Sequence, residues 1–364
     1  MSRKCRLPAS SGLKGFSLIE LMVSLTIGLI IAIAAFSAYL GSSSASRMAE
    51  AQGRMNEDAQ AALSILNQQM RMLQNNPNQS GRTKESQRNP VYSPYQYSME
   101  LSSQPPVFEL AKYSIRGCDN KFDNISAAVG LDKLNCDVET NSAPDPLNLN
   151  PDSIAINYEA DAFNTVTTGT SQVPTDCLGL PLTAITATFQ TVPPPEPSSS
   201  DPRSFSHSYY VADNRFYISP QTPNTSLGLY CQGNGVNSEG STSTAKLMVE
   251  NIEDMQFKYG VVGPSNSSIP TSELPVAGYL TAYELSKNKW LNDSTHVARW
   301  GKVVSVLVCV LVRSEALVVS NIATAAYIPC FGEVNSPSPS PDLRLRRAYY
   351  TTVVLRNRRP PLNP

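Results

Sequence analysis

Two features near the N-terminus of this 364-residue chain stand out for the chemistry they could support. One is a junction of a small and an aromatic residue, Gly15–Phe16, and the other is a single carboxylate, Glu20. From Phe16 to Leu40 the only ionisable groups are Glu20 and the phenol of Tyr39. A carboxylate at bilayer depth costs about 3 kcal/mol on insertion scales, so it is expected to have a partner and a purpose. Ion pairing inside an apolar environment is therefore the chemistry that Glu20 predicts.

The element that must position Glu20 is the apolar run itself. A run of 18 or more apolar residues is a membrane-spanning candidate, because about 20 helical residues cross the hydrocarbon core. The alternatives are an uncleaved signal anchor and an ordinary signal peptide, for which Ser37–Tyr39 and Ser42–Ala45 offer weak cleavage sites. Two details weigh against them: Gly15–Phe16 lies on the cytoplasmic side of the run, and Glu20 would damage an ordinary signal. The basic residues that hold the preceding segment in the cytoplasm are Arg3, Lys4, Arg6 and Lys14.

The cysteines are even in number once the basic N-terminal segment, which contains Cys5, is set aside. An even count in an exported chain favours disulfides. Six cysteines allow fifteen pairings, and the sequence alone cannot choose among them, although we predict that neighbours in sequence pair. The rival interpretation, a zinc site, lacks any Cys-x-x-Cys, and the chain has only 2 histidines. The predicted pairs are Cys118–Cys136, Cys177–Cys231 and Cys309–Cys330.

Groups that could support catalysis or bind a metal are few. His207 lies between two serines, but adjacent residues of a strand point to opposite faces, and no Gly-x-Ser-x-Gly occurs. His296 is interpreted as a packed or surface histidine. Four aspartates lie near one another in sequence, but their spacing lacks the EF-hand pattern. We therefore expect no catalytic residue, no metal site, no cofactor and no enzymatic activity. The four aspartates are Asp119, Asp123, Asp132 and Asp137.

Composition favours an exported domain over a cytosolic enzyme. Charged residues make up 16% of the chain and prolines number 28, which suits a loop-rich extracytoplasmic β domain. The chain has 29 basic and 30 acidic residues, and residues 1–15 contain basic residues but no acid, so the remainder is acidic. No basic surplus points to nucleic acid as a primary partner.

A second helical pattern follows the apolar run. We expect the helix to loosen at the polar stretch Gly41–Ser44 and to stop at Asn75–Pro77. Between them Arg54 forms i,i+3 and i,i+4 pairs with Glu57 and Asp58 on the wet face. Apolar residues trace one helical stripe, which is expected to pack against a sheet as core. The stripe consists of Met48, Met55, Ala59, Ala62, Leu63, Leu66, Met70 and Leu73.

The region after about Arg116 has the patterns of a β domain. Alternation predicts a half-buried strand at Asp152–Tyr158, and Asp213–Asn214 predicts the two-residue turn of a hairpin over 208–218. Lys302–Arg313 is apolar on both faces and is expected to be a central strand. Further strands are predicted at 246–249, at 255–259 and at 347–357, the last of which closes the sheet.

The N-terminal segment resembles the class III leader of type IV pilins and of the pseudopilins of type II secretion. The resemblance covers residues 14–40 and is carried by Lys14-Gly15-Phe16-Ser17-Leu18-Ile19-Glu20 and the apolar run. In those families a prepilin peptidase cuts after the glycine and methylates the new N-terminus. The resemblance implies cleavage between Gly15 and Phe16 and N-methylation of Phe16. It also implies that Glu20 pairs with the N-terminal amine of a neighbouring subunit and so sets the register of assembly.

Later segments resemble PilW-type minor pilins, and the pseudopilin J family shares parts of the pattern. The resemblance implies an α+β type IV pilin fold, with a long N-terminal helix packed on an enlarged antiparallel β-sheet head with long loops. The matching segments are Asn67–Met72, Val249–Gly260, Val303–Ser314 and Thr351–Asn357. The expected divisions are a cleaved leader at 1–15, a transmembrane half-helix at 16–40, an amphipathic periplasmic half-helix at 41–76, a loop-rich segment at 77–115 and a β-rich head at 116–364.

The resemblance implies a minor pilin that joins a tip complex and initiates assembly of a type IV pilus for twitching, adhesion or DNA uptake. Expected partners are the prepilin peptidase, other minor pilins and the major pilin. The expected location is the inner membrane, with the head in the periplasm, before assembly and the pilus at the cell surface afterwards. Two alternatives stay open: a J-type minor pseudopilin of a type II secretion system, and a membrane-anchored periplasmic binding protein or enzyme.

Overall fold

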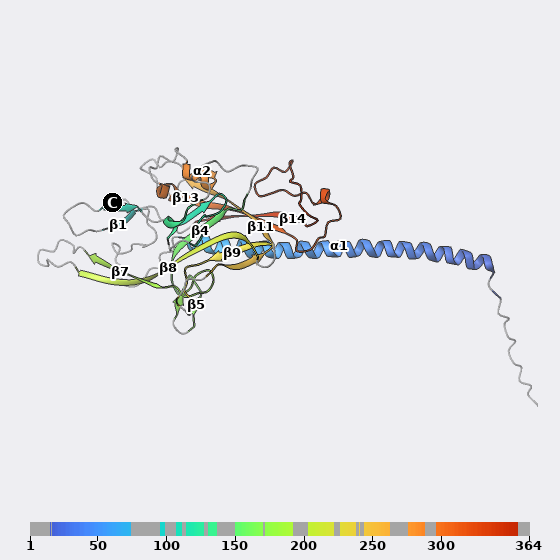
Figure 1. Ribbon diagram of the computed structural model, residues 1–364, viewed down its shortest axis with the longest axis horizontal. Coiled ribbons are helices and arrows are strands. Elements are labelled where there is room, and N and C mark those ends of the chain that lie inside the picture. Colours follow the sequence, from blue (N-terminus) through green and yellow to red (C-terminus); the bar gives the residue numbers. More distant parts are fainter. Residues whose placement is uncertain are drawn as a thin grey trace, which may run out of the picture. The chain divides into compact units, whose positions relative to one another are not determined.

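A computed structural model gives the arrangement of the chain (Figure 1). It describes residues 15, 17–73, 95–98, 107–110, 114–126, 130–136, 150–169, 172–191, 203–221, 226–237, 240, 244–262, 276–287 and 296–355. The chain divides into two compact units, Met1–Ala51 and Gln52–Pro364.

Helix α1 (Leu18–Met72) runs without interruption and contributes residues to both units (Figure 1). Its first turn forms where the Ser17 carbonyl accepts a hydrogen bond from the Glu20 N–H at 3.0 Å. The helix persists through Gly41–Ser44, so the prediction that it loosens there was wrong. A glycine costs about 1 kcal/mol in a helix interior, which a helix of this length tolerates. The Ser44 hydroxyl also donates back to the carbonyl that begins this stretch, at 2.9 Å, and is thereby satisfied within the helix.

Two antiparallel sheets lie in the second unit. In the six-stranded sheet the strand order is β10-β9-β8-β4-β3, and β7 pairs with β8. In the four-stranded sheet the order is β12-β11-β13-β14. The first sheet comprises β3 (Ile115–Cys118), β4 (Ser153–Ala160), β7 (Ala184–Thr191), β8 (Arg203–Pro220), β9 (Leu227–Gln232) and β10 (Lys246–Glu250). The second comprises β11 (Ile252–Val262), β12 (Val276–Leu280), β13 (Val303–Arg313) and β14 (Arg346–Val354).

Shorter elements complete the described part of the chain. Two small pairs of strands are β1 (Tyr95–Ser98) with β2 (Val107–Leu110) and β5 (Thr167–Thr168) with β6 (Val173–Pro174). The short helices are α2 (Ala282–Lys287) and α3 (His296–Trp300), with 3₁₀ turns at Leu131–Lys133 and Ile322–Ala325. A long N-terminal helix and a head of antiparallel sheets confirm the expected α+β class.

The apolar stripe on the second part of α1 forms core, as predicted. Six of its members are buried in one cluster with residues of both sheets, among them Ile156 of β4 and Val308 of β13. Burying a Leu or Met side chain stabilises a fold by about 1.5–3 kcal/mol, so this stripe makes a large contribution to the head. Met48, in the first unit, is exposed. The buried members are Met55, Ala59, Ala62, Leu66, Met70 and Leu73.

Two strand predictions have different outcomes. β13 lies between β11 and β14, which confirms that Lys302–Arg313 contains a central strand. β4 was expected to be half-buried, but all of its residues are buried. The reason is that the side chains on both of its faces are enclosed within the head, where some of its polar groups find partners. The Ser153 hydroxyl, for example, donates to the Asn120 carbonyl at 3.4 Å.

The hairpin predicted over 208–218 was wrong, because this region belongs to one continuous strand, β8, of 18 residues. Asp213 and Asn214 are 1% and 0% exposed, whereas a turn would expose them. The Asp213 carboxylate accepts hydrogen bonds from Arg215 Nε at 3.0 Å and Nη2 at 2.9 Å. Asn214 donates to Gln69 of α1 at 2.7 Å. Buried partners therefore override the local preference of Asp-Asn for a turn.

Three disulfides cross-link the head. They join Cys118 to Cys136, Cys177 to Cys231 and Cys309 to Cys330, with Cα–Cα distances of 5.4, 6.6 and 5.7 Å. Each bond joins two cysteines that follow one another in the order of the six along the chain. Closing loops of these lengths restricts the unfolded chain and stabilises the fold by about 3–4 kcal/mol per bond.

Candidate assembly site

The first part of α1 carries a long, mainly apolar surface. From Leu18 to Leu40 its large apolar side chains are all exposed within the chain. By length and composition this helix could cross a membrane, and it is the one such helix in the described ranges. Exposing this many large apolar side chains to water is unfavourable, so we infer that this surface lies in an apolar environment.

The hydroxyl groups within this surface are satisfied by the helix itself. The hydroxyls of Ser24, Thr26 and Ser37 each donate to the carbonyl three residues earlier, at 3.0, 2.9 and 2.9 Å. Such back-bonding lets a polar side chain remain in an apolar environment without an external partner. No hydrogen-bond partner from a neighbouring molecule is therefore needed by Ser24, Thr26 or Ser37.

Glu20 is the exception on this surface. Its carboxylate is exposed, and the described residues provide it with neither an ion pair nor a side-chain hydrogen bond. It lies in the first turn of α1, where the helix dipole favours an anion by about 0.3–1 kcal/mol. That is less than the cost of an unpaired carboxylate at bilayer depth. The arrangement can therefore bind a cation supplied from outside the chain.

The predicted cleavage junction is partly described. Gly15 is exposed, and no described atom lies within 4 Å of the position that a Cβ would take there. Phe16 lies outside the described residues. The surroundings of Gly15 thus leave room for close approach to its backbone.

In the second unit, polar contacts tie α1 to both sheets. Gln69 Oε1 accepts hydrogen bonds from Asn214 Nδ2 at 2.7 Å and from the Tyr158 hydroxyl at 3.3 Å, in the six-stranded sheet. On the four-stranded sheet the Tyr349 hydroxyl donates to Asn56 Oδ1 at 2.6 Å. The buried apolar stripe and these polar contacts together fix the distal part of α1 in the head.

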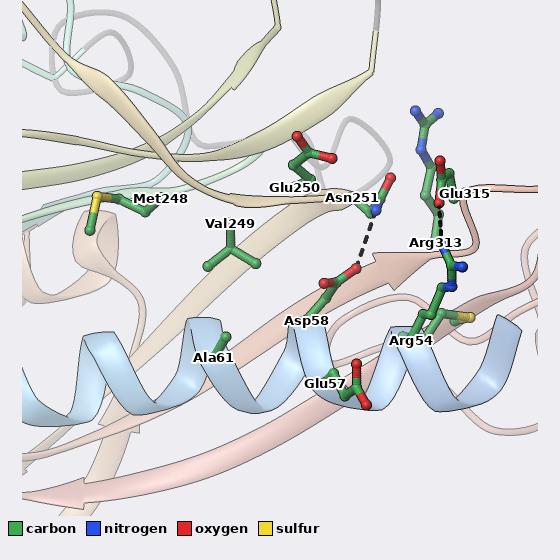
Figure 2. A pocket seen from close by; sticks show the side chains of 11 residues that line it. Arg54, Glu57, Asp58, Ala61, Met248, Val249, Glu250, Asn251, Arg313 and Glu315 are labelled. Atoms are coloured by element: carbon green, nitrogen blue, oxygen red, sulfur yellow. Dashed lines mark hydrogen bonds and ion pairs between the residues drawn. The ribbon is translucent and has the colours of Figure 1, made fainter. Parts of the chain in front are cut away.

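An open groove of about 480 Å³ lies where α1 passes β10 and the end of β13 (Figure 2). Two residues of the helix, Arg54 and Asp58, reach across it. Arg54 Nη1 lies 3.0 Å from Glu315 Oε2, and Asp58 Oδ2 accepts from Asn251 Nδ2 at 3.2 Å. Burial raises the pKa of Asp58, and the nearby carboxylates of the groove add to the rise. These carboxylates belong to Glu250, Glu57 and Glu315.

The other groups considered for chemistry have structural surroundings where they are described. Asp119 accepts hydrogen bonds from the N–H groups of Ala282 and Tyr283, at 2.8 and 3.1 Å, and so begins α2. His296 Nε2 lies 2.7 Å from Ser286 Oγ. Asp123 is exposed, and no group of three metal-ligating side chains occurs among the residues searched, which are the described ones. The side chains of Asp132, Asp137 and His207 lie outside the described residues.

Two buried carboxylates were not anticipated from the sequence. Asp152 accepts from the N–H of Phe257 at 2.9 Å and of Asn120 at 3.2 Å, and burial raises its pKa well above the usual value. Asp254 accepts from the N–H of Met255 at 2.8 Å, and burial raises its pKa to about 6. Nothing in the sequence distinguished these aspartates from exposed ones, because burial depends on how the two sheets pack.

Two family models match the chain. The prokaryotic N-terminal methylation motif matches residues 12–36, which include Gly15–Phe16 and Glu20. Type IV Pilus-assembly protein W, PilW, matches residues 209–357, from within β8 to just beyond β14. Together the two matches support a PilW-type minor pilin. No curated protein and no solved structure matches the chain.

The PilW match covers a complete part of the head. The whole four-stranded sheet and the strand β13 at its centre fall within the PilW match. The PilW family is a structural, non-enzymatic one. A pilin with a prepilin leader implies assembly with other pilins and processing by a peptidase, and the single apolar helix with such a leader fits an inner-membrane anchor.

Proposed function

We propose that this chain is a minor pilin that helps to initiate assembly of a type IV pilus and lies at or near its tip. The observation that carries the proposal is Glu20. It is an exposed carboxylate on an apolar helix whose serine and threonine hydroxyls are satisfied internally. A group of this kind acts between molecules, because its own chain provides no partner among the described residues.

Processing supplies the missing cation. A prepilin peptidase cuts between Gly15 and Phe16 and methylates the amine of Phe16, which becomes the first residue. That amine is positively charged, and it pairs with Glu20 of a neighbouring subunit. Pairing offsets the cost of the buried carboxylate only when the two helices are in the correct axial register, so the pair selects one register of assembly.

The apolar helix and the disulfides indicate where the chain is located before and after assembly. Before assembly the apolar part of α1 anchors the chain in the inner membrane, with the head in the periplasm. The three disulfides support this location, because such bonds persist in oxidising compartments. After assembly the chain belongs to the pilus at the cell surface.

The size of the head supports a structural role at the tip of the pilus. Residues 116–364 form a large domain, which disfavours close repetition along a fibre. The apolar helices would bundle with those of other minor pilins, while the heads associate in the periplasm. This complex would lower the barrier to adding the first major subunits, in support of twitching, adhesion or DNA uptake.

Two measurements test the proposal. The intact mass of the mature chain, without reduction, should correspond to a start at Phe16, one added methyl group and three disulfides. Deletion of the gene should remove surface pili from cells that still make the major pilin. A mature chain that starts at Met1 or near residue 45, or undiminished piliation in the deletion strain, would refute it. Normal piliation with a loss of protein secretion would indicate the pseudopilin alternative.

A further inference from the structure

One strand edge of the head is long, regular and open. β14 (Arg346–Val354) ends the four-stranded sheet and pairs on one side only, with β13. All nine of its residues align with β13 in consecutive register without a shift. Among the described strands none is hydrogen-bonded to its outer side. Such an edge presents a row of unpaired N–H and C=O groups, which is a template for a strand of another chain.

The register determines which backbone groups of β14 face outward. The Leu355 N–H donates to the Val304 carbonyl at 2.9 Å, and hydrogen-bonded positions alternate along an antiparallel pair. Thr351 therefore directs its N–H and C=O toward β13, whereas Tyr350 and Thr352 direct theirs outward. The outer edge offers these donors and acceptors at every second residue.

Side chains of the outward-directed residues are available on one face of the strand. Tyr350 and Val354 are 48% and 58% exposed, and Thr352 between them is also exposed. Tyr350 is held in place, because its hydroxyl accepts from the Phe331 N–H at 3.2 Å and the two rings lie 5.7 Å apart. A side chain that is ordered in advance loses less entropy on binding.

The other described edges carry features that discourage pairing. β12, on the opposite side of the same sheet, has five residues and a register shift against β11. β10 has a register shift against β9 and a charged residue at each end, and β3 has four residues. β7 is regular, but most of its side chains lie outside the described residues. Bulges, short length and charge are the usual protections of a sheet edge, and β14 has no bulge and has its arginines only at its first two positions.

We propose that the outer edge of β14 accepts an extended strand from the head of a different pilin, rather than from a second copy of this chain, and that this strand continues the four-stranded sheet. This inference rests on the proposed function, which supplies pilin partners. Residues 356–364 of the same chain are unsuited to the position, because they include three prolines, which have no N–H to donate. The partner strand should place apolar or β-branched side chains beside Tyr350 and Val354 and an acidic one near the exposed Arg347.

Site-specific photo-cross-linking in cells that make the full chain tests this inference. A benzophenone amino acid replaces Tyr350 or Thr352 at the edge, and Phe163, which is 98% exposed, serves as the control position. Irradiation should join the two edge variants, but not the control, to another pilin chain identified by mass spectrometry. A cross-link between two copies, or within one chain, would overturn the inference by identifying a different occupant. The absence of any cross-link from the edge, in cells that depend on the chain for pili, would overturn it too.

A pair of proline variants makes the test sharper. Thr352→Pro removes an outward-facing N–H and leaves the ladder with β13 intact, whereas Thr351→Pro removes an N–H from that ladder. We expect Thr352→Pro to abolish the cross-link from position 350 while the chain stays at its normal level with three disulfides. Thr351→Pro should instead lower the level of folded chain. A cross-link that survives Thr352→Pro would show that no strand pairs at this edge. Since cross-links are scored separately from pili, undiminished piliation after gene deletion refutes the proposed function alone.

Discussion

Asn214 Nδ2 donates a hydrogen bond to Gln69 Oε1 at 2.7 Å, and this bond joins the middle of strand β8 to helix α1. The Tyr158 hydroxyl donates to the same oxygen and accepts from Asn214, both at 3.3 Å. Burial raises the pKa of Tyr158 to about 12, so the phenol remains a donor at neutral pH. The three side chains satisfy one another in a region that water reaches poorly, which is the condition under which such a network stabilises a fold.

Loss of the Gln69 amide should therefore destabilise the head. Gln69→Ala leaves Asn214 and Tyr158 without their shared acceptor, and we expect a loss of about 1–3 kcal/mol in the free energy of unfolding. Gln68→Ala is the matched control, because Gln68 is exposed on the same turn and should change stability by less than about 0.5 kcal/mol. Urea unfolding of the purified chain in detergent measures both, and equal effects of the two variants would contradict the role given to this network.

Asp254 should make the head more stable in mild acid. Its pKa is about 6 in the folded chain and about 3.9 for an aspartate in an unfolded chain, so the folded state binds the proton more tightly. The stability that this proton contributes is fully present below pH 4 and is lost as the pH rises through about 6. This difference between the folded and unfolded pKa values corresponds to a loss of about 3 kcal/mol in the free energy of unfolding at pH values above 7. Asp254→Asn should raise the melting temperature at pH 7.5 and reduce its dependence on pH between 4 and 7.

The control for this change is Asp123→Asn, at an exposed aspartate. The Asn side chain at position 254 keeps an oxygen that can accept from the Met255 N–H and from Gln256, which Asp254 does at 2.8 and 3.0 Å. Structural damage therefore does not explain a change in the pH profile. Parallel pH profiles for the native chain and Asp254→Asn would show that this carboxyl does not titrate as described.

Glu20→Val should separate membrane insertion from assembly. The substitution removes the carboxylate and leaves the apolar surface and the hydroxyl bonds of α1 unchanged, so the chain should still be cleaved and membrane-bound. Without the ion pair it should be absent from sheared filaments. Ser24→Ala is the control, because the Ser24 hydroxyl donates to the Leu21 carbonyl of its own helix, and this variant should enter filaments normally. Immunoblots of membrane and sheared fractions measure this, and Glu20→Val at native levels in filaments would rule out a register role.

Arg346 should not be replaceable by lysine. Its Nε and Nη2 contact the two oxygens of Glu253, at 2.6 and 2.9 Å, and its Nη1 contacts Asp342 at 2.7 Å. The hydrogen bond from Arg346, together with those from Arg344, holds the pKa of Asp342 well below its usual range. A lysine cannot reproduce the bidentate geometry, so Arg346→Lys should cost about 1–3 kcal/mol. The neighbouring Arg347→Lys, at an exposed position, should cost little, and similar melting temperatures for both variants would argue against the bidentate pair.

Local patterns predicted the elements of the fold well where one face of an element is buried. The apolar spacing along 55–73 predicted the buried stripe of α1, and the run of valines in β13 predicted a central strand, because burial leaves a periodic mark on sequence. The same reasoning failed at Asp213–Asn214. There the turn preference of two residues was outweighed by Arg215, Gln69 and the pairing of β8 with β4 at these positions.

The candidate site was predicted unevenly for a related reason. Glu20 could be identified because a single charge in an apolar run is visible without any knowledge of the fold. The groove beside Asp58 and the open edge of β14 could not, because both depend on strand order. The sequence contains the strands, but it does not state which of them ends a sheet.

Cys309 has a consequence for how the head resists reduction. It lies at the centre of β13 and is buried, and its bond to Cys330, which is also buried, ties the loop between β13 and β14 to the middle of the sheet. A reductant in solution reaches this bond only where the sheet and the loop open locally. Mild reduction should therefore leave the bond intact in chains that stay closed.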